Sequence, residues 1–342
     1  MTIMMIESPE IETSTRSRKG NRVLFAITSS ASRAVLHKAA HLARALGVEL
    51  ELFYPAFDPD IVHPARGSSR SVDEGIREYV HQRERQLWSL AEEVREPGLK
   101  VHTYVEWDTR PDIAIIRAVL RRRPALLVVE SFRKSRTETL LFDQTVHKLI
   151  ETCPCPLLLT RIAHAYPSHP RVLAAVDPMH AHAKPAALDD AILTTANEVA
   201  NALGGELHLF HARVPWANAS HQARVLRWVP DIEKSESQVA YEHLVSQRVT
   251  RLAHNHNVPN LQTHLIDGDV IDCLPSFLCT EGVDIVAMGA LSRSILQGIL
   301  IGDTASRLLY ELDCDVLVVK PPARVSQHAK PAGPAEPNRV GY

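Results

Sequence analysis

The sequence RVLFAIT at residues 22–28 returns as RVLAAVD at residues 171–177. The longer stretch ALGVELELFYP at residues 45–55 returns as ALGGELHLFHA at residues 202–212. The copies lie about 150 to 160 residues apart, well beyond the roughly 20 to 50 residues of a solenoid repeat. The chain is therefore predicted to contain one domain twice rather than an array of short repeats.

A third match extends the duplication toward the end of each half. The apolar run ALLVVE at residues 125–130 aligns with DIVAMG at residues 284–289. The same shift of about 159 residues also aligns Thr145 with Thr304 and Cys155 with Cys314. Equivalent positions of the two halves can therefore be compared residue by residue.

The composition excludes several classes of protein. The 342 residues suit two domains, and 38 basic against 40 acidic residues offer no basic face for nucleic acid. No apolar window of about 18 residues occurs, so we predict no membrane-spanning helix. The first 20 residues contain acidic residues where a signal peptide would be apolar. Because the five cysteines form no disulfide framework, we expect a cytoplasmic protein.

Each half alternates short apolar runs, typical of buried strands, with longer amphipathic runs, typical of helices. In the first half we expect strands at residues 23–27, 48–53, 101–105, 126–129 and 157–160, and helices at residues 31–46, 72–95, 111–121 and 142–151. In the second half we expect strands at residues 172–176, 206–210, 262–266, 285–288 and 316–319, and helices at residues 188–203, 235–255, 270–279 and 304–312. This alternation predicts an α/β fold of two tandem, doubly wound domains, each with a five-stranded parallel sheet.

The predicted domain limits follow from these elements. A disordered tail at residues 1–20 precedes a first domain at residues 21–161, a linker at residues 162–169 and a second domain at residues 170–321. Residues 322–342, rich in proline, alanine and charge, are expected to be a second disordered tail.

Ligands of open α/β sheets bind at the carboxyl ends of the strands, where the strand order switches. In the second half, Asp177 and Gly289 begin the loops at this edge. The loop GALSRSILQGILIGDT at residues 289–304 leads into a helix, whose first N–H groups favour an anion. Arg293 offers further donors, and Thr304 is either a hydroxyl ligand or the helix N-cap.

The segment at residues 288–320, ending in DVLVVK, resembles the end of a universal stress protein domain. Nucleotide-binding members of that family carry Gly-x-x-Gly, nine residues, and then Gly-Ser or Gly-Thr. Gly289 matches the first glycine of this motif and Gly302 the third. The resemblance also places Asp177 at the family's aspartate after the first strand, and Ala212 where the backbone meets adenine.

Two residues of the second half depart from the family motif. Ser292 replaces the second glycine and adds a side chain where backbone would approach phosphate. Asp303 replaces the serine or threonine and adds negative charge beside the expected phosphates, unless a metal or Arg293 offsets it. These departures favour a site that is empty or holds a different ligand.

The first half departs further from the motif. By the constant shift, the motif's three glycines and its final serine or threonine are replaced by Glu130, Arg133, Asp143 and Gln144. Thr28, which ends RVLFAIT, stands in place of the aspartate that ends RVLAAVD. We predict that the first half binds no ATP by the family's usual mode.

The resemblance covers both halves and implies the adenine nucleotide alpha hydrolase-like fold of tandem universal stress proteins. It implies a non-enzymatic stress-response regulator or sensor, with no catalytic residues and no metal, in which ATP is the candidate cofactor. The family's dimer edge implies that the two halves pair through their final strands, and further self-association stays open. The predicted ligand-site residues are Asp177, Ala212, Gly289, Ser292, Arg293, Gly302, Asp303 and Thr304.

Two alternative functions stay open. One is slow ATP hydrolysis at the second-half loop. The other is binding of an apolar or lipid-like ligand between the halves, for which the apolar loop residues are Trp216, Val225, Leu226, Trp228 and Val229.

Three smaller features have plain structural interpretations. Cys153-Pro154-Cys155 invites a redox or metal role, but an isolated C-x-C pair followed by an apolar strand favours ordinary strand-entry cysteines. His180 and His182 follow Asp177 without a third visible metal ligand. The basic cluster of Arg133, Lys134 and Arg136 is either a solvated loop or a different kind of anion site.

Overall fold

The computed structural model describes residues 20–28, 32–63, 71–131, 139–179, 187–213, 234–290 and 312–321. Within these ranges the strands are β1 (Arg22–Ala26), β2 (Glu49–Ala56), β3 (Val101–Trp107), β4 (Leu126–Glu130), β5 (Leu157–Thr160), β6 (Arg171–Ala175), β7 (Glu206–Arg213), β8 (Thr263–Asp267), β9 (Ile285–Gly289) and β10 (Asp315–Val319). The helices are α1 (Arg33–Ala45), α2 (Pro59–Val62), α3 (Val72–Glu93), α4 (Pro111–Arg122), α5 (Thr139–Thr152), α6 (Leu188–Ala202), α8 (Lys234–Asn255), α9 (Val270–Glu281) and the 3-10 turn η1 (Asn260–Gln262).

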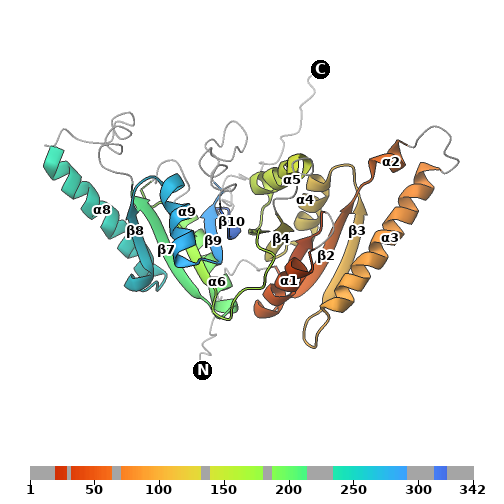
Figure 1. Ribbon diagram of the computed structural model, residues 1–342, viewed down its shortest axis with the longest axis horizontal. Helices are drawn as coiled ribbons and strands as arrows, with labels where there is room; N and C mark the ends of the chain where they lie inside the picture. Colours follow the sequence, from red (N-terminus) through yellow and green to blue (C-terminus); the bar gives the residue numbers. More distant parts are fainter. Residues whose placement is uncertain are drawn as a thin grey trace, which may run out of the picture.

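The strands form one sheet in the order β3-β2-β1-β4-β5-β10-β9-β6-β7-β8. Figure 1 shows the two halves side by side, with β4 and β9 toward the middle and the long helices α3 and α8 at the outer ends. Within each half every pairing is parallel, as the predicted α/β fold requires. The tandem α/β fold class is thereby confirmed.

The sequence periodicity located most elements to within a few residues. The short helix α2 was not expected; its first turn is capped by Asp58, whose side chain accepts a hydrogen bond from the amide of Asp60, with Pro59 at the first helical position. β2 extends to Ala56, beyond the expected end, because it continues to pair with β3 as far as Trp107. Of the helix expected at residues 304–312, only Leu312 lies within the described residues.

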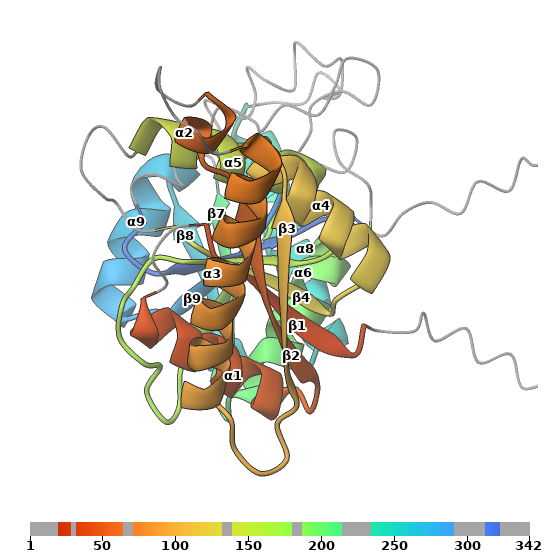
Figure 2. The ribbon, with the colours of Figure 1, turned by 90° about the vertical axis from the view of Figure 1, so that its right-hand side faces the viewer.

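Two apolar layers sandwich the sheet, and each layer contains residues from both halves. One layer includes buried side chains of α1, α3, α6 and α8, such as Leu36, Leu87, Leu193 and Val245. The other includes side chains of α4, α5 and α9. Figure 2 shows α3 lying along β2 and β3 at the first-half end of the molecule. Burial of the strands on both faces explains their nearly continuous apolar sequences.

The halves meet at an antiparallel junction between β5 and β10. Val316 is in register with Leu159, Leu317 with Leu158, and Val318 with Leu157. These side chains are at most 4% exposed. We call this pairing the β5–β10 seam.

A buried carboxylate lies beside the seam. Asp315, the first residue of β10, accepts hydrogen bonds from the amides of Arg161 and Ile162 at 2.7 and 3.1 Å. It also accepts one from the hydroxyl of Tyr166 at 2.6 Å. Burial is the main cause that holds the pKa of Tyr166 well above its usual value, and the charge of Asp315 is the next. The segment that links the halves is therefore tied to the second half through Asp315.

Candidate functional site

The candidate site lies at the carboxyl edge of three adjacent parallel strands. In the second half β9, β6 and β7 are neighbours in the sheet, and β7 also pairs with β8. Gly289 ends β9, Asp177 follows β6 by two residues, and Ala212 is the penultimate residue of β7. The fold thus brings three of the predicted site residues to the edge where α/β proteins bind ligands.

The other five predicted site residues lie outside the described residues. They are Ser292, Arg293, Gly302, Asp303 and Thr304. The structure therefore describes the strand ends of the candidate site, while its predicted phosphate loop stays a prediction.

Gly289 has a packing role that accounts for its lack of a side chain. A β-carbon built on Gly289 would lie 2.8 Å from Cδ2 of Leu188 and 3.2 Å from Cδ1 of Ile192. Both neighbours belong to α6 and are buried. Glycine at this position therefore allows the end of β9 to approach the first turns of α6 closely.

Asp177 is held in a small network of backbone and carboxylate groups. Its Oδ1 accepts a hydrogen bond from the amide of Met179 at 3.3 Å. Its own amide donates to Oδ1 of Asp189 at 3.2 Å. Asp189 lies in the first turn of α6 and is 6% exposed. Two carboxylates therefore shape the loop after β6, and a ligand there would meet acceptors for hydroxyl groups.

Sequence reasoning missed several residues at this edge. Besides Asp189, Arg248 of α8 donates from Nη1 to the carbonyl of Pro178 at 3.1 Å. The buried ring of His211 has its Nδ1 3.0 Å from the carbonyl of Val176. The two acidic residues at the start of α6 offered a local signal for Asp189. Arg248 had none, because only the tertiary fold brings α8 to the loop after β6.

The corresponding edge of the first half is arranged differently. Glu130 ends β4 as Gly289 ends β9, and it is only 5% exposed. Its Oε2 accepts a hydrogen bond at 3.0 Å from the amide of Ser32, the N-cap residue of α1. A carboxylate is a favourable partner for a helix N-terminus. Glu130 thus places a negative side chain where the second half has only a hydrogen atom.

Thr28 occupies the position in the first half that corresponds to Asp177. Its hydroxyl is buried and has no hydrogen-bond partner among the described residues. Arg133, Lys134 and Arg136 lie outside the described residues, as do the side chain of Asp143 and the histidines His180 and His182. The five apolar residues proposed for a cleft between the halves, Trp216, Val225, Leu226, Trp228 and Val229, also lie outside them.

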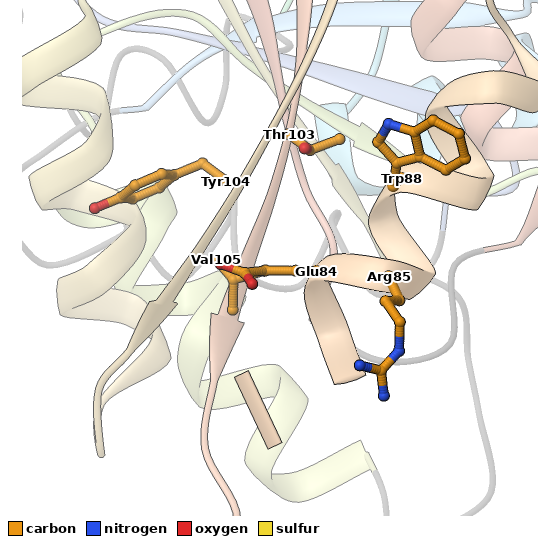
Figure 3. Close-up of a pocket in the computed structure, with 6 residues that line it drawn as sticks. All are labelled: Glu84, Arg85, Trp88, Thr103, Tyr104 and Val105. Atoms are coloured by element: carbon orange, nitrogen blue, oxygen red, sulfur yellow. The ribbon is translucent and has the colours of Figure 1, made fainter. Parts of the chain in front are cut away.

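A cavity of about 360 Å³ lies away from both strand-end sites, at the outer edge of the first half between α3 and β3. Figure 3 shows Trp88 and Arg85 on the helix, with Tyr104 pointing to the far side of the strand. The lining residues are Glu84, Arg85, Trp88, Thr103, Tyr104 and Val105. Three of them belong to α3, and the other three come from the middle of β3 rather than its carboxyl end. This cavity is therefore distinct from the candidate site.

Comparison with known proteins assigns the family. The model of the universal stress protein family matches residues 20–161 and again residues 169–320. The chain belongs to the universal stress protein family. It has two such domains in tandem, and no helix within the described ranges is both long and apolar enough to span a membrane.

Individual relatives match most of this chain at low sequence identity. Universal stress protein E of Photorhabdus laumondii is 24% identical over 295 residues, which cover 84% of this chain and 90% of the relative. A solved structure of a functionally unknown protein from Pseudomonas aeruginosa has a TM-score of 0.64 at 21% identity, covering 89% of this chain and 93% of that one. A universal stress protein from Archaeoglobus fulgidus has a TM-score of 0.58 at 17% identity, covering 88% and 99%. At these identities the structural likenesses establish the fold alone.

Proposed function

We propose that this universal stress protein is a non-enzymatic stress-response regulator with one adenine-nucleotide site, in its second half. The observation that carries the proposal is the difference between two equivalent strand ends. β9 ends in Gly289, whereas β4 ends in Glu130, which bonds the N-terminus of α1. A phosphate approaching the first-half edge would meet a buried carboxylate, and repulsion between like charges opposes its binding.

The second-half edge has groups suited to the sugar and base of a nucleotide. The carboxylate of Asp177, at the end of β6, is a hydrogen-bond acceptor for ribose hydroxyls. The backbone near Ala212 supplies a surface at the neighbouring strand end. The phosphates would then lie toward the loop that contains Ser292 and Asp303. In this proposal those two residues weaken ATP binding without abolishing it.

The pairing of the two halves and the state of the cysteines bear on assembly and location. The β5–β10 seam makes the single chain the equivalent of a dimer, in which an apolar edge strand from each half is covered by the other. All five cysteines are free thiols, which suits the reducing environment of the cytoplasm. These thiols support our proposal that the protein lies in the cytoplasm. We further propose that nucleotide state alters its association with partners.

Equilibrium dialysis with labelled ATP tests the proposed site through a matched pair of variants. Asp177→Asn keeps an oxygen for the amide of Met179 but removes the charge, and should weaken ATP binding by about tenfold or more. Thr28→Val changes the corresponding first-half position with little change in shape, and should leave binding at the wild-type level. Equal ATP affinities for the wild type and Asp177→Asn, or weaker binding by Thr28→Val, would overturn the placement of the site.

A further inference from the structure

Two cysteine sulfurs lie side by side at the entrance to β5. The Sγ atoms of Cys153 and Cys155 are 3.5 Å apart, with only Pro154 between the two residues in sequence. Cys153 is buried and Cys155 is half-buried, so the pair lies just beneath the surface. Both are reduced, and the short connection keeps the two thiols together.

The pair shares its protons unequally. Its mutual hydrogen bond is the largest cause that lowers the pKa of Cys153, and it is also the largest cause that raises the pKa of Cys155. Lys320 favours the Cys153 thiolate further through its charge. The Nζ of Lys320 is anchored by donation to the carbonyl of Glu151 at 2.6 Å. Both pKa shifts therefore favour the thiolate on Cys153 and the proton on Cys155.

The second half has no such pair. The constant shift aligns Cys155 with Cys314, but it aligns Cys153 with Leu312. Cys314 is buried, and burial raises its pKa to about 12. Cys314 thus has the environment of an unreactive core thiol and serves as an internal reference for the first-half pair.

We propose that Cys153 and Cys155 form a dithiol site that a hydroperoxide oxidises reversibly to an intramolecular disulfide. The Cys153 thiolate attacks one peroxide oxygen, the O–O bond breaks, and Cys153 becomes a sulfenic acid while hydroxide, or the corresponding alkoxide, leaves. Cys155 then attacks the sulfur of the sulfenic acid, its proton joins the departing hydroxyl, and water is released. Two electrons pass from the two sulfurs to the peroxide. An external dithiol reductant returns them by thiol–disulfide exchange.

The location links this chemistry to the contact between the halves. Cys155 lies two residues before β5, and Lys320 directly follows β10. Lys320 also reaches across to the end of α5 through Glu151. Oxidation removes the thiolate that attracts Lys320. The loss of this attraction occurs next to the β5–β10 seam.

Mass spectrometry of the full-length protein tests the proposal. The reduced chain is treated with hydrogen peroxide, remaining thiols are alkylated, and the chain is digested with trypsin. Cleavage after Lys148 and Arg161 leaves both cysteines in one fragment, residues 149–161. We expect this fragment to escape alkylation and to be about two mass units lighter than its reduced form, and a dithiol reductant to restore both thiols. Two alkylated cysteines after peroxide has oxidised the exposed Cys279, or a sulfinic acid in place of the disulfide, would overturn the proposal.

Variants separate the dithiol reaction from general oxidation. Cys155→Ser should stop disulfide formation and leave Cys153 to proceed to higher oxides, whereas Cys314→Ser should leave the fragment's behaviour unchanged. Lys320→Gln should slow disulfide formation several-fold without preventing it. Should a serine variant fail to fold, the wild-type fragment mass still decides the outcome.

Discussion

The ammonium group of Lys38 lies 2.7 Å from Oδ2 of Asp315, although the two residues are 277 positions apart and belong to different halves. Their side chains are 1% and 0% exposed. Lys38 also donates to the carbonyl of Ile162 at 2.9 Å and lies 4.4 Å from the ring centroid of Tyr166. Each charge therefore has partners only when α1, the linking segment and β10 are assembled.

Removing one member of this pair should destabilise the protein strongly. Lys38→Met leaves the buried carboxylate of Asp315 without its cation, and such unpaired buried charges cost about 3 to 5 kcal/mol. Urea unfolding should report a loss of this size. Arg95→Gln, which breaks the exposed ion pair with Glu92, is the control and should stay close to the wild type.

A double-mutant cycle then measures the interaction itself. Lys38→Met combined with Asp315→Asn should cost less than the sum of the two single changes, because the second change removes the charge that the first left unpaired. Strict additivity would show that the two side chains do not interact in solution.

A charge placed in the β5–β10 seam should loosen the halves. Val318 is 4% exposed and in register with Leu157, so Val318→Asp buries a carboxylate in an apolar layer. We expect a clear loss of thermal stability and a larger radius of gyration in small-angle X-ray scattering. Val239→Asp, at a position on α8 that is 66% exposed, provides the control. Unchanged compactness and melting for Val318→Asp would argue against the seam.

Acidification should weaken the second half through two stacked histidines. Nδ1 of His208 lies 3.0 Å from Nε2 of His264, and the rings are 5.3 Å apart. Burial is the main cause that lowers the pKa of His264, and the charge of His208 lowers it further. The unfolded chain thus binds the proton more tightly than the folded one. This contribution to the free energy of unfolding is therefore fully present above about pH 6.5, the pKa of His264 in the unfolded chain. It is lost as the pH falls from there toward the lower pKa of the folded chain.

Thermal melting between pH 7.5 and 5.5 checks this sign. His264→Gln, which keeps a polar partner for His208 but does not titrate, should flatten the acid-side fall in melting temperature. His81→Gln, at an exposed position on α3, should keep the wild-type profile. A His264→Gln profile that is parallel to the wild type would assign the acid sensitivity to other groups.

Gly289 should resist substitution even without any ligand. The β-carbon of Gly289→Ala would press on Leu188, and overpacking of a core typically costs about 1 to 3 kcal/mol. Leu188→Ala makes room, so the double variant should show favourable coupling between the two positions in urea unfolding. Additive losses would exclude this contact as the reason for the glycine.

Local periodicity was sufficient to predict the strands, most of the helices and the α/β class, because apolar spacing along a segment reflects its own burial. The internal repeat also identified Glu130 and Gly289 as equivalent. Neither the apolar spacing nor the repeat indicates which side chains distant in sequence contact each other. Lys38 lies in an ordinary amphipathic helix, and nothing near it in sequence indicates Asp315.

The candidate site was predictable to a similar extent. Parallel strands bring their carboxyl ends to one edge, which was enough to place Asp177 and Gly289 together. Ala212 was added by the resemblance to the family. The contact of Gly289 with α6 and the hydrogen bond from Asp177 to Asp189 depend on how α6 packs, which the strand pattern does not specify. The C-x-C motif was interpreted as two ordinary strand-entry cysteines, because sequence alone does not give the distance between their sulfurs.

Counting the nucleotide bound per chain decides whether the second half holds the one nucleotide site. The full chain is purified without added nucleotide and then incubated with ATP. Free ligand is removed, the protein is denatured, and the released molecules are identified and counted by mass spectrometry. We expect about one adenine nucleotide per chain, lost in Asp177→Asn and kept in Thr28→Val. Two nucleotides per chain, a lipid-like molecule in place of nucleotide, or no uptake at millimolar ATP would contradict it.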